Sequence, residues 1–320
     1  MSKTLIIGGG GMVGQKLAHS LADAPIAGDV TLFDIGFPEN GAPAANRVAG
    51  DVTDPAAIKA LAAQRPDLVF HLAAIVSGEA EANFEKGWGI NMMAFRTFLE
   101  AMRGEVDASG GTYRPRIIFT SSIAVFGAPF PDKIDDEFLC APQTSYGAQK
   151  AISELMLSDY IRKGYFDGMS IRLPTICVRP GKPNAAASGF FSGIIREPLN
   201  GMDAVLPVST DVRHWHASPR SAVGFLRDAA TMDLSPLGTR RALNMPGVSC
   251  TVEEQIEALR ELAGNDAVAR IKPVPDETIM GIVAGWPRNF APDRALALGF
   301  KAEADFREII ETYIADDLPK

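Results

Sequence analysis

The sequence predicts an α/β protein built on a doubly wound parallel sheet, with a smaller mixed α/β domain after it. Short apolar runs alternate with helical patterns through the first half of the chain, which is typical of βαβ units. Most runs are almost continuously apolar, as in strands that helices cover on both faces. Glycines or polar residues follow several of them, at the sheet edge where ligands bind in such folds.

Strands and helices are expected to alternate up to Pro174. The expected strands cover residues 4–7, 30–34, 46–52, 68–72, 116–120 and 169–173, most of them short apolar runs. The expected helices cover residues 12–21, 55–63, 84–102 and 146–161, where apolar residues recur at helical spacing. Parallel strands joined in this way have right-handed connections, which gives the doubly wound arrangement.

The composition changes after Pro174, and this change predicts a domain boundary. Residues 177–192 are rich in Gly, Pro, Ala, Ser and Asn and predict a loop. Helices are expected at 219–230, 251–263 and 304–314, with short strands at 204–208 and 241–245. We therefore expect a first domain at 1–176 and a mostly substrate-binding region at 177–320, with a return to the first domain around 204–230.

Composition excludes several classes of protein. The chain has 320 residues, 47% of them hydrophobic, and a formal net charge of −8, so no cationic field attracts nucleic acid. No apolar stretch approaches the ~20 residues that a membrane helix needs. The three cysteines, Cys140, Cys177 and Cys250, lie far apart, without the spacing of a metal site. We expect a cytoplasmic protein with a small-molecule substrate and with no nucleic-acid or membrane partner.

A glycine-rich turn follows the first expected strand and opens the first helix. Gly8, Gly11 and Gly14 are three residues apart, and Met12 and Val13 begin the helix. This pattern lets a dinucleotide pyrophosphate approach the backbone and the helix N-terminus. Asp34 ends the second strand, where a carboxylate accepts hydrogen bonds from ribose hydroxyls and repels a 2′-phosphate. The pattern predicts a Rossmann-like domain that binds NAD in preference to NADP.

Three further polar groups predict acid–base chemistry. Ser122 ends the fifth strand, and Tyr146 and Lys150 lie four residues apart on one face of the next helix. An ammonium beside a phenol stabilises the phenolate and lowers the tyrosine pKa. This set suits the oxidation of a secondary alcohol, in which Tyr146 takes the hydroxyl proton, Ser122 holds the substrate oxygen and NAD accepts the hydride.

Together these motifs resemble the extended short-chain dehydrogenase/reductase family, also called the NAD-dependent epimerase/dehydratase family. The resemblance runs from Gly8 to about Phe300. Besides the glycines and the serine, tyrosine and lysine, the residues that carry it are Asp51-Val52-Thr53-Asp54, His71-Leu72-Ala73-Ala74, Asn91, Val125-Phe126-Gly127, Arg213-His214-Trp215-His216 and residues 293–300. The sequence departs from the family pattern at Gln149, where a small hydroxyl residue is usual before the lysine, and at Phe126, where tyrosine is more usual.

The resemblance implies roles for individual residues. Ser122, Tyr146 and Lys150 would be catalytic, and the last two would also contact the cofactor. Further cofactor contacts would come from Asp51 and Val52 near the adenine, from Leu72, Ala73 and Ala74 under the cofactor, from Asn91, and from Pro174 and Ile176 near the nicotinamide. Two long helices, at 84–102 and 146–161, match the pair through which family members form homodimers.

Within the family, residues 174–188 and 212–220 resemble enzymes that oxidise the 2-hydroxyl of a four-carbon sugar acid. Such a substrate needs a cation or several donors for its carboxylate and hydroxyls. The candidate substrate-binding residues are Ser77, Ser122, Tyr146, Thr175, Asn184, Ser188 and Arg213. Arg213 is the preferred partner of the carboxylate, and an ion pair with Asp211 or other acidic surface groups is the alternative for its side chain.

Two other functions stay open. One is a sugar-nucleotide epimerase or dehydratase that keeps NAD tightly bound through each turnover. The other is a non-catalytic NAD-sensing protein, which would not need Tyr146 and Lys150 as a pair. No metal is expected: His214 and His216 point to one face of an extended strand but are too few for a metal site, and His71 lies inside an apolar strand.

Overall fold

The computed structural model describes residues 2–26, 28–42, 46–181 and 187–319. They fall into two compact units. The first contains Met1–Val125, Thr144–Arg172 and Val223–Leu243, and the second contains Phe126–Gln143, Leu173–Ala222 and Asn244–Lys320. The segment that returns to the first unit is thus 223–243, whereas the sequence suggested a return around 204–230.

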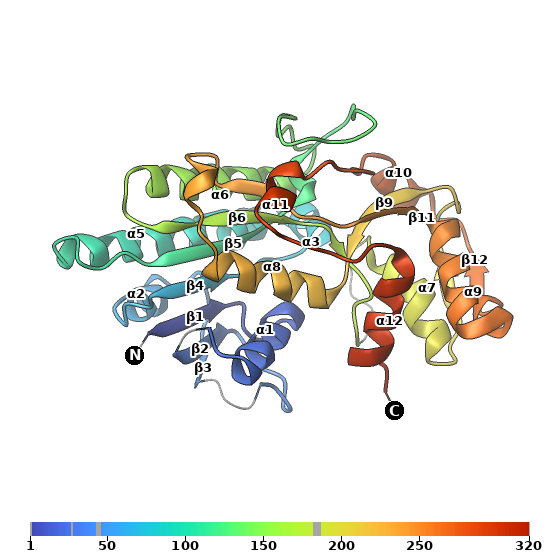
Figure 1. The fold of residues 1–320 in the computed structure, drawn as a ribbon, viewed down its shortest axis with the longest axis horizontal. Coiled ribbons are helices and arrows are strands. Elements are labelled where there is room, and N and C mark those ends of the chain that lie inside the picture. Colours follow the sequence, from blue (N-terminus) through green and yellow to red (C-terminus); the bar gives the residue numbers. More distant parts are fainter. Residues whose placement is uncertain (1, 27, 43–45, 182–186, 320) are drawn as a thin grey trace. The chain divides into compact units, whose positions relative to one another are not determined.

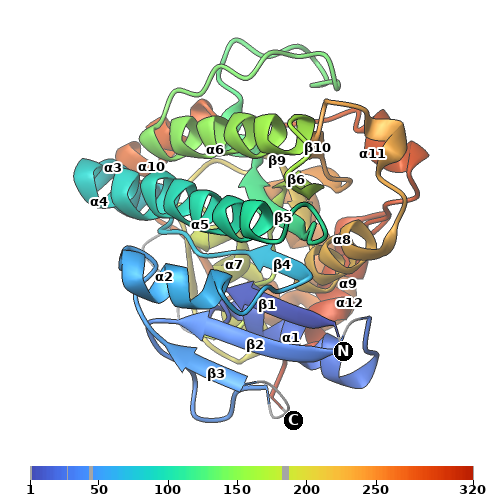
Figure 2. The ribbon, with the colours of Figure 1, turned by 90° about the vertical axis from the view of Figure 1, so that its left-hand side faces the viewer.

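A seven-stranded sheet forms the centre of the first unit, in the order β10-β6-β5-β4-β1-β2-β3 (Figures 1 and 2). The strands are β1 (Lys3–Ile7), β2 (Asp29–Asp34), β3 (Asn46–Ala49), β4 (Leu68–His71), β5 (Arg116–Ser122), β6 (Asp167–Leu173) and β10 (Ala242–Asn244). β1 pairs in parallel with both β2 and β4, so the strand order reverses at β1. Ligands of open α/β sheets bind at the carboxyl ends of the strands beside such a reversal.

Helices cover this sheet on both faces. They are α1 (Met12–Asp23), α2 (Pro55–Ala62), α3 (Ser77–Ala82), α4 (Phe84–Trp88), α5 (Ala94–Ala108), α6 (Ser145–Arg162) and α8 (Pro219–Thr231), of which the part from Val223 on belongs to this unit. Leu5 and Ile7 join the core with residues of α2, α5 and α6, whereas the side chain of Ile6 between them faces the other way. Figure 2 shows α5 and α6 side by side on one face, with α1 on the opposite face. The fold class is the one that the sequence predicted.

Two arginines tie the returning segment to the rest of the first unit. Arg116 on β5 donates to the carbonyl oxygens of Ala230 and Met232 at the end of α8, both at 2.9 Å. Arg227 on α8 donates to the carbonyl oxygens of Ser20 and Ala24 around the end of α1, both at 2.8 Å. The strand expected at 241–245 is β10 at the edge of this sheet. Its assignment to the smaller domain was therefore wrong.

The second unit contains two small sheets. β9 (Arg213–Ala217) lies between β11 (Val248–Thr251) and β7 (Thr175–Ile176), and β8 (Ala204–Leu206) pairs with β12 (Ile271–Pro273). The helices of this unit are α7 (Gly189–Leu199), α9 (Val252–Val268), α10 (Glu277–Ala284), α11 (Asp293–Ala297) and α12 (Phe306–Asp316).

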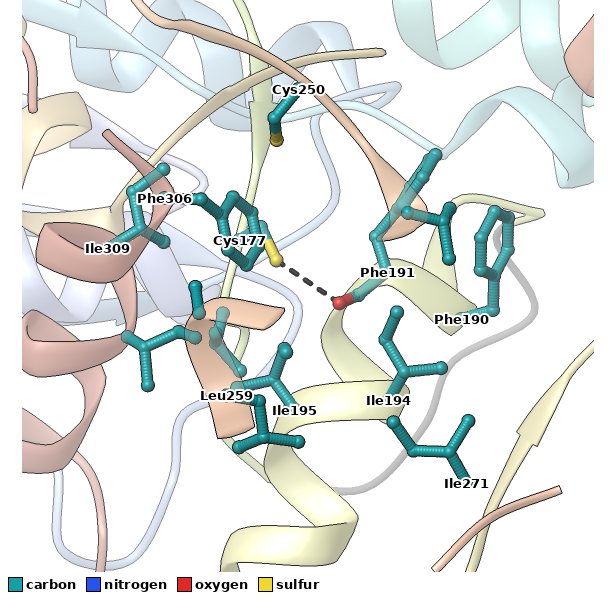
Figure 3. Packing of buried hydrophobic residues seen from close by; sticks show 14 of the residues in the cluster. Cys177, Phe190, Phe191, Ile194, Ile195, Cys250, Leu259, Ile271, Phe306 and Ile309 are labelled. Atoms are coloured by element: carbon teal, nitrogen blue, oxygen red, sulfur yellow. Dashed lines mark hydrogen bonds between the residues drawn. The ribbon is translucent and has the colours of Figure 1, made fainter. Parts of the chain in front are cut away.

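Helix α7 begins inside the segment that the sequence predicted to be a loop. Phe190, Phe191, Ile194 and Ile195 recur at helical spacing, and their burial in the core of the second unit stabilises the helix (Figure 3). The sequence predicted a loop here because the many Gly, Pro and Asn residues before Phe190 masked the start of this apolar pattern. Among the described residues, no helix combines the length and apolar character that crossing a membrane requires.

Candidate active site

The turn between β1 and α1 has no room for a Cβ at Gly8 or at Gly14. Gly8 has a φ of 88°, and a Cβ there would lie 2.6 Å from the amide nitrogen of Ala73. A Cβ on Gly14 would lie 2.3 Å from the carbonyl oxygen of Gly8. In contrast, a Cβ on Gly11 would meet only that same oxygen, at 3.5 Å. The loop is therefore tightly packed at Gly8 and Gly14 and open at Gly11.

The open side of this loop is the N-terminus of α1. Gly11 is the N-cap residue and gives no side-chain hydrogen bond, and the first turn holds no acidic residue. The amide groups of Met12, Val13 and Gly14 lack carbonyl partners within the helix, and the helix dipole favours an anion there. A dinucleotide pyrophosphate needs this arrangement, so the residues present fit an NAD cofactor.

Gly10 is a site residue that the sequence analysis missed. Its amide donates to Oδ2 of Asp34 at 2.9 Å, and the amide of Ile35 donates to Oδ1 at 2.7 Å. A Cβ on Gly10 would lie 2.1 Å from the carbonyl oxygen of Gly36. The two hydrogen bonds fix the Asp34 carboxylate but leave each oxygen able to accept another, as two ribose hydroxyls require. The run of four glycines was the available signal, because three-residue spacing does not account for the glycine at this position.

Asp51 and Val52 lie close to the end of β2. The amide of Gly50 donates to the carbonyl oxygen of Asp34 at 2.9 Å, which holds this segment beside the strand. The amide and hydroxyl of Thr53 both donate to Oδ1 of Asp51 at 2.8 Å, and these bonds hold the pKa of Asp51 below its usual range. Val52 is buried in the core next to the strand. Both residues thus neighbour the expected adenosine end of the site.

The segment after β4 passes directly over the glycine turn. The amides of Leu72 and Ala73 both donate to the carbonyl oxygen of Ile7, at 2.8 and 3.0 Å. Two residues beyond Ala73, the amide of Ile75 donates to Oδ1 of Asn91 at 2.9 Å. Residues 72–75, including the exposed Ala74, are therefore held from the sheet side and from the long helical segment that contains Asn91.

The three predicted catalytic residues belong to adjacent elements of the first unit. Ser122 is the last residue of β5, and Thr144 caps α6 by accepting from the amide of Gly147. Lys150 is buried, and its ammonium nitrogen lies 5.7 Å from the centre of the Tyr146 ring. The same nitrogen donates to the carbonyl oxygen of Thr120 at 2.7 Å.

Burial shifts the pKa of both titratable groups of this set. Burial raises the pKa of Tyr146 to about 12, and its hydrogen bond with Ser122 opposes this shift only in part. Burial lowers the pKa of Lys150 to about 7, against the attraction of Glu154. The tyrosine shift is opposite in direction to the one expected from the sequence. The physical reason is that desolvation of the phenolate outweighs the stabilisation that the hydrogen bond with Ser122 gives.

The candidate substrate residues are divided between the units. Ser122 and Tyr146 are in the first unit, as is Ser77, the first residue of α3. Thr175, Ser188 and Arg213 are in the second, together with Pro174 and Ile176 from the expected nicotinamide neighbours. Asn184 lies outside the described residues.

In the second unit, the candidate side chains already have protein partners. Thr175 Oγ1 lies 2.7 Å from Nε2 of His214. Ser188 accepts from the Arg179 guanidinium at 2.8 Å. Arg213 donates to the carbonyl oxygen of Ser249 at 2.9 Å and forms an ion pair with Glu254 at 3.2 Å. The acidic partner of Arg213 is therefore Glu254 and not Asp211.

The three buried histidines pack against aromatic rings. The His71 ring lies among Phe95, Phe98 and Phe119, the nearest ring centre at 4.6 Å. His214 and His216 are on one face of β9 with ring centres 5.2 Å apart, as their spacing predicted. Within the described ranges, no cluster of three or more His, Cys, Asp or Glu side chains could hold a metal ion.

Known proteins resemble this chain over most of its length. A model of the NAD dependent epimerase/dehydratase family matches residues 4–232. A D-erythronate dehydrogenase from Cupriavidus necator is 45% identical, over 98% of each chain. Another from Haemophilus influenzae is 40% identical over 99% of this chain and 100% of its own. A solved structure, described as a nucleoside-diphosphate-sugar epimerase from Agrobacterium tumefaciens, is 54% identical with a TM-score of 0.94, over 98% of this chain and 94% of that one.

Proposed function

We propose that this chain, which belongs to the NAD-dependent epimerase/dehydratase family, oxidises D-erythronate to 2-dehydro-D-erythronate with NAD. It is a dehydrogenase that acts on a CH–OH group of a small molecule with a nicotinamide cofactor, as its relatives' names indicate. The observation that carries the finer proposal is the buried Lys150 ammonium beside the ring of Tyr146, with Ser122 at the adjacent strand end. Relatives named for the same reaction match nearly the whole chain.

Each of the three residues has one role in this proposal. Ser122 donates a hydrogen bond to the substrate oxygen and so holds the hydroxyl against Tyr146. Tyr146 accepts the hydroxyl proton at Oη while the C2–H bond breaks and a carbonyl forms. This role requires the pKa of Tyr146 to fall from its cofactor-free value of about 12, as the positive charge of a bound nicotinamide would favour. Lys150 offsets the negative charge of the phenolate, because its pKa of about 7 leaves it partly protonated near neutral pH. NAD supplies the acceptor for the hydride that leaves C2.

The cofactor is proposed to be NAD and not NADP. The Asp34 carboxylate is held by the amides of Gly10 and Ile35 and cannot move away from a 2′-phosphate without losing both hydrogen bonds. Its negative charge would repel that phosphate, whereas two ribose hydroxyls could donate to it. The remaining cofactor and substrate residues named from the sequence keep their proposed roles.

A second candidate function is a sugar-nucleotide epimerase or dehydratase, because the 54% identical structure is described as a nucleoside-diphosphate-sugar epimerase. An NAD-sensing protein is less favoured, since sensing needs no buried lysine beside a tyrosine. The decisive experiment incubates the protein with NAD and sugar acids of four, five and six carbons and follows NADH by absorbance. Release of one NADH per four-carbon acid supports the dehydrogenase. Conversion of a sugar nucleotide without net NADH supports the epimerase.

Assembly and location are proposals as well. We expect a homodimer through α5 and α6, by analogy with the family, and a cytoplasmic location, which suits three free cysteines. Light scattering at several concentrations tests the dimer, and a monomer mass at every concentration would exclude it.

A further inference from the structure

Gln149 is a buried side chain for which the catalytic roles above have no use. It lies on α6 between Tyr146 and Lys150, and its side chain is fully buried. Its Oε1 accepts a hydrogen bond from Nδ2 of Asn91 at 2.7 Å. A buried hydrogen bond between two side chains 58 residues apart in sequence fixes the position of one element against the other.

Asn91 in turn holds the backbone of a single residue from both sides. Its Oδ1 accepts from the amide of Ile75 at 2.9 Å, and its Nδ2 donates to the carbonyl oxygen of Ile75 at 3.2 Å. Asn91 itself is within a π-helical turn, Gly89–Met93, that separates α4 from α5. Such turns are frequent at functional sites because they change the direction in which side chains leave the helix.

Ile75 belongs to the segment that passes over the glycine turn. Ala73, two residues earlier, lies close to Gly8. A Cβ on Gly8 would be 2.6 Å from the amide nitrogen of Ala73. Ser77, two residues later, is a candidate substrate residue. The hydrogen bonds therefore run from the catalytic helix through Gln149 and Asn91 to the segment between the cofactor loop and Ser77.

Room for Gln149 depends on Gly87. A Cβ on Gly87 would lie 2.7 Å from Nε2 of Gln149. That nitrogen has no hydrogen-bond partner among the described residues, so only Oε1 of the amide is used. The side chain therefore uses its length and its acceptor oxygen, and Gly87 in α4 leaves the space for it.

We propose that Gln149 is a positioning residue, which through Asn91 holds residues 72–77 in register with Tyr146 and Lys150. The hydrogen-bond chain itself is independent of the proposed function, whereas the kinetic consequence rests on it. Without the hydrogen bond of Gln149, residues 72–77 would move relative to α6. The cofactor and Tyr146 would then adopt the reactive geometry in a smaller fraction of the molecules.

The primary test is hydrogen exchange of the cofactor-free protein, measured by mass spectrometry on peptides that cover residues 72–77. Gln149→Met keeps the length of the side chain and removes the acceptor, so exchange in these peptides should become roughly three- to tenfold faster. Gln149→Glu keeps an acceptor oxygen, and burial favours its neutral acid form, so exchange should return close to the wild-type rate. Ser153→Ala is the matched control: its hydroxyl donates to the main-chain carbonyl oxygens of Asn91 and Gln149 and touches neither side-chain amide hydrogen bond, so exchange should be unchanged.

A second variant tests the same contact from the other side. The methyl group of Gly87→Ala would displace Nε2 of Gln149, so exchange in residues 72–77 should also become faster. Alanine favours the helix more than glycine does, so helix propensity alone would predict the opposite change. If Gln149→Met folds poorly, Gly87→Ala alone decides the question by the same measurement. Wild-type exchange in both variants would overturn the proposal, as would an equal increase over the whole first unit.

Kinetics separate this proposal from failure of the proposed function. In Gln149→Met, kcat should fall and the dissociation constant of NAD should rise, while the pH midpoint of kcat stays unchanged because Tyr146 and Lys150 keep their surroundings. A shifted midpoint would overturn the positioning role. If the wild-type protein oxidises no sugar acid but the variants still exchange faster at residues 72–77, the positioning role of Gln149 stands. Only the proposed dehydrogenase function is then rejected.

Discussion

The two units fix their candidate site residues in different ways. In the first, Asp34 accepts from the amide of Gly10 and Lys150 donates to the carbonyl oxygen of Thr120, so main-chain groups of the fold hold both charges. In the second, Arg213 pairs with Glu254, and Ser188 accepts from Arg179. Main-chain groups thus fix the first set. In the second set Arg213 also donates to the carbonyl oxygen of Ser249, but Arg213, Ser188 and Thr175 each have a side-chain partner as well. Substitutions in the first unit should therefore have larger and more specific effects.

Tyr146→Phe should have the largest effect. Phenylalanine keeps the ring but removes the proton acceptor, so kcat with the sugar acid should fall by about 10³–10⁴-fold. NAD binding and the melting temperature should stay close to wild type, and both serve as controls. A variant with near-normal kcat, at a pH where the chemical step limits turnover, would show that another group takes the proton.

Lys150→Met should lower kcat by about 10²–10³-fold, and unlike Tyr146→Phe it should also weaken NAD binding. Its effect on stability has a defined sign. The folded pKa of about 7 lies below the usual 10.5, so the unfolded chain binds more protons between these values and wild-type stability rises as pH increases from 7 to 10.5. The methionine variant should lack this rise in denaturant titrations at several pH values. An identical pH dependence in the two proteins would contradict the buried, shifted lysine.

Ser122→Ala should cost less than either change, because it removes one hydrogen bond to the substrate oxygen and leaves the base in place. A loss of about tenfold in kcat is expected from a bond of that strength. A loss as large as that of Tyr146→Phe would give Ser122 a role beyond holding the substrate.

Asp34→Ala should change the cofactor preference by about tenfold or more, through weaker NAD binding and the loss of repulsion toward NADP. The ratio of kcat/KM values for the two cofactors measures it, with kcat at saturating NAD as the control. Faster wild-type turnover with NADP than with NAD at equal concentration would refute the assignment of Asp34 to the ribose.

Acid should destabilise both units through their buried histidines. Burial lowers the pKa of His71, which also faces the Lys150 charge, to about 3, and that of His214 to about 4. Both values are below the unfolded 6.5, so each histidine removes up to about 1.4 kcal/mol of stability per pH unit as the pH falls from 6.5 toward its folded pKa. His71→Phe should flatten this dependence in the first unit. If His71→Phe unfolds with the wild-type pH slope, the histidine does not take up its proton on unfolding.

In the second unit, Arg213→Ala should raise KM for the sugar acid by about three- to tenfold and leave kcat nearly unchanged, as expected for a binding contact of moderate strength. Glu254→Gln is its counterpart, since it frees Arg213 without removing it and should not raise KM. If KM is unchanged in Arg213→Ala, Arg213 does not bind the substrate carboxylate and serves only in the ion pair with Glu254.

The same contrast explains what the sequence could predict. The parallel sheet, Gly8, Gly14 and Asp34 follow from local patterns, because turn geometry and strand ends depend on neighbouring residues. The pairing of Arg213 with Glu254 and the contact of Gln149 with Asn91 depend on residues far apart in sequence, and composition does not encode them. The direction of the Tyr146 pKa shift was missed for a related reason. The spacing to Lys150 was visible in the sequence, but the burial that dominates the shift was not.

The return of residues 223–243 to the first unit affects how the protein is made. The end of α8 accepts hydrogen bonds from Arg116, and β10 completes the sheet edge. Both leave the ribosome only after two segments of the second unit, Phe126–Gln143 and Leu173–Ala222, have been synthesised. Until then, the nascent chain carries an open strand edge at β6, which is the kind of surface that chaperones protect during translation. A fragment that ends at residue 176 would keep this edge open permanently, and we expect it to aggregate even though it contains the whole glycine turn.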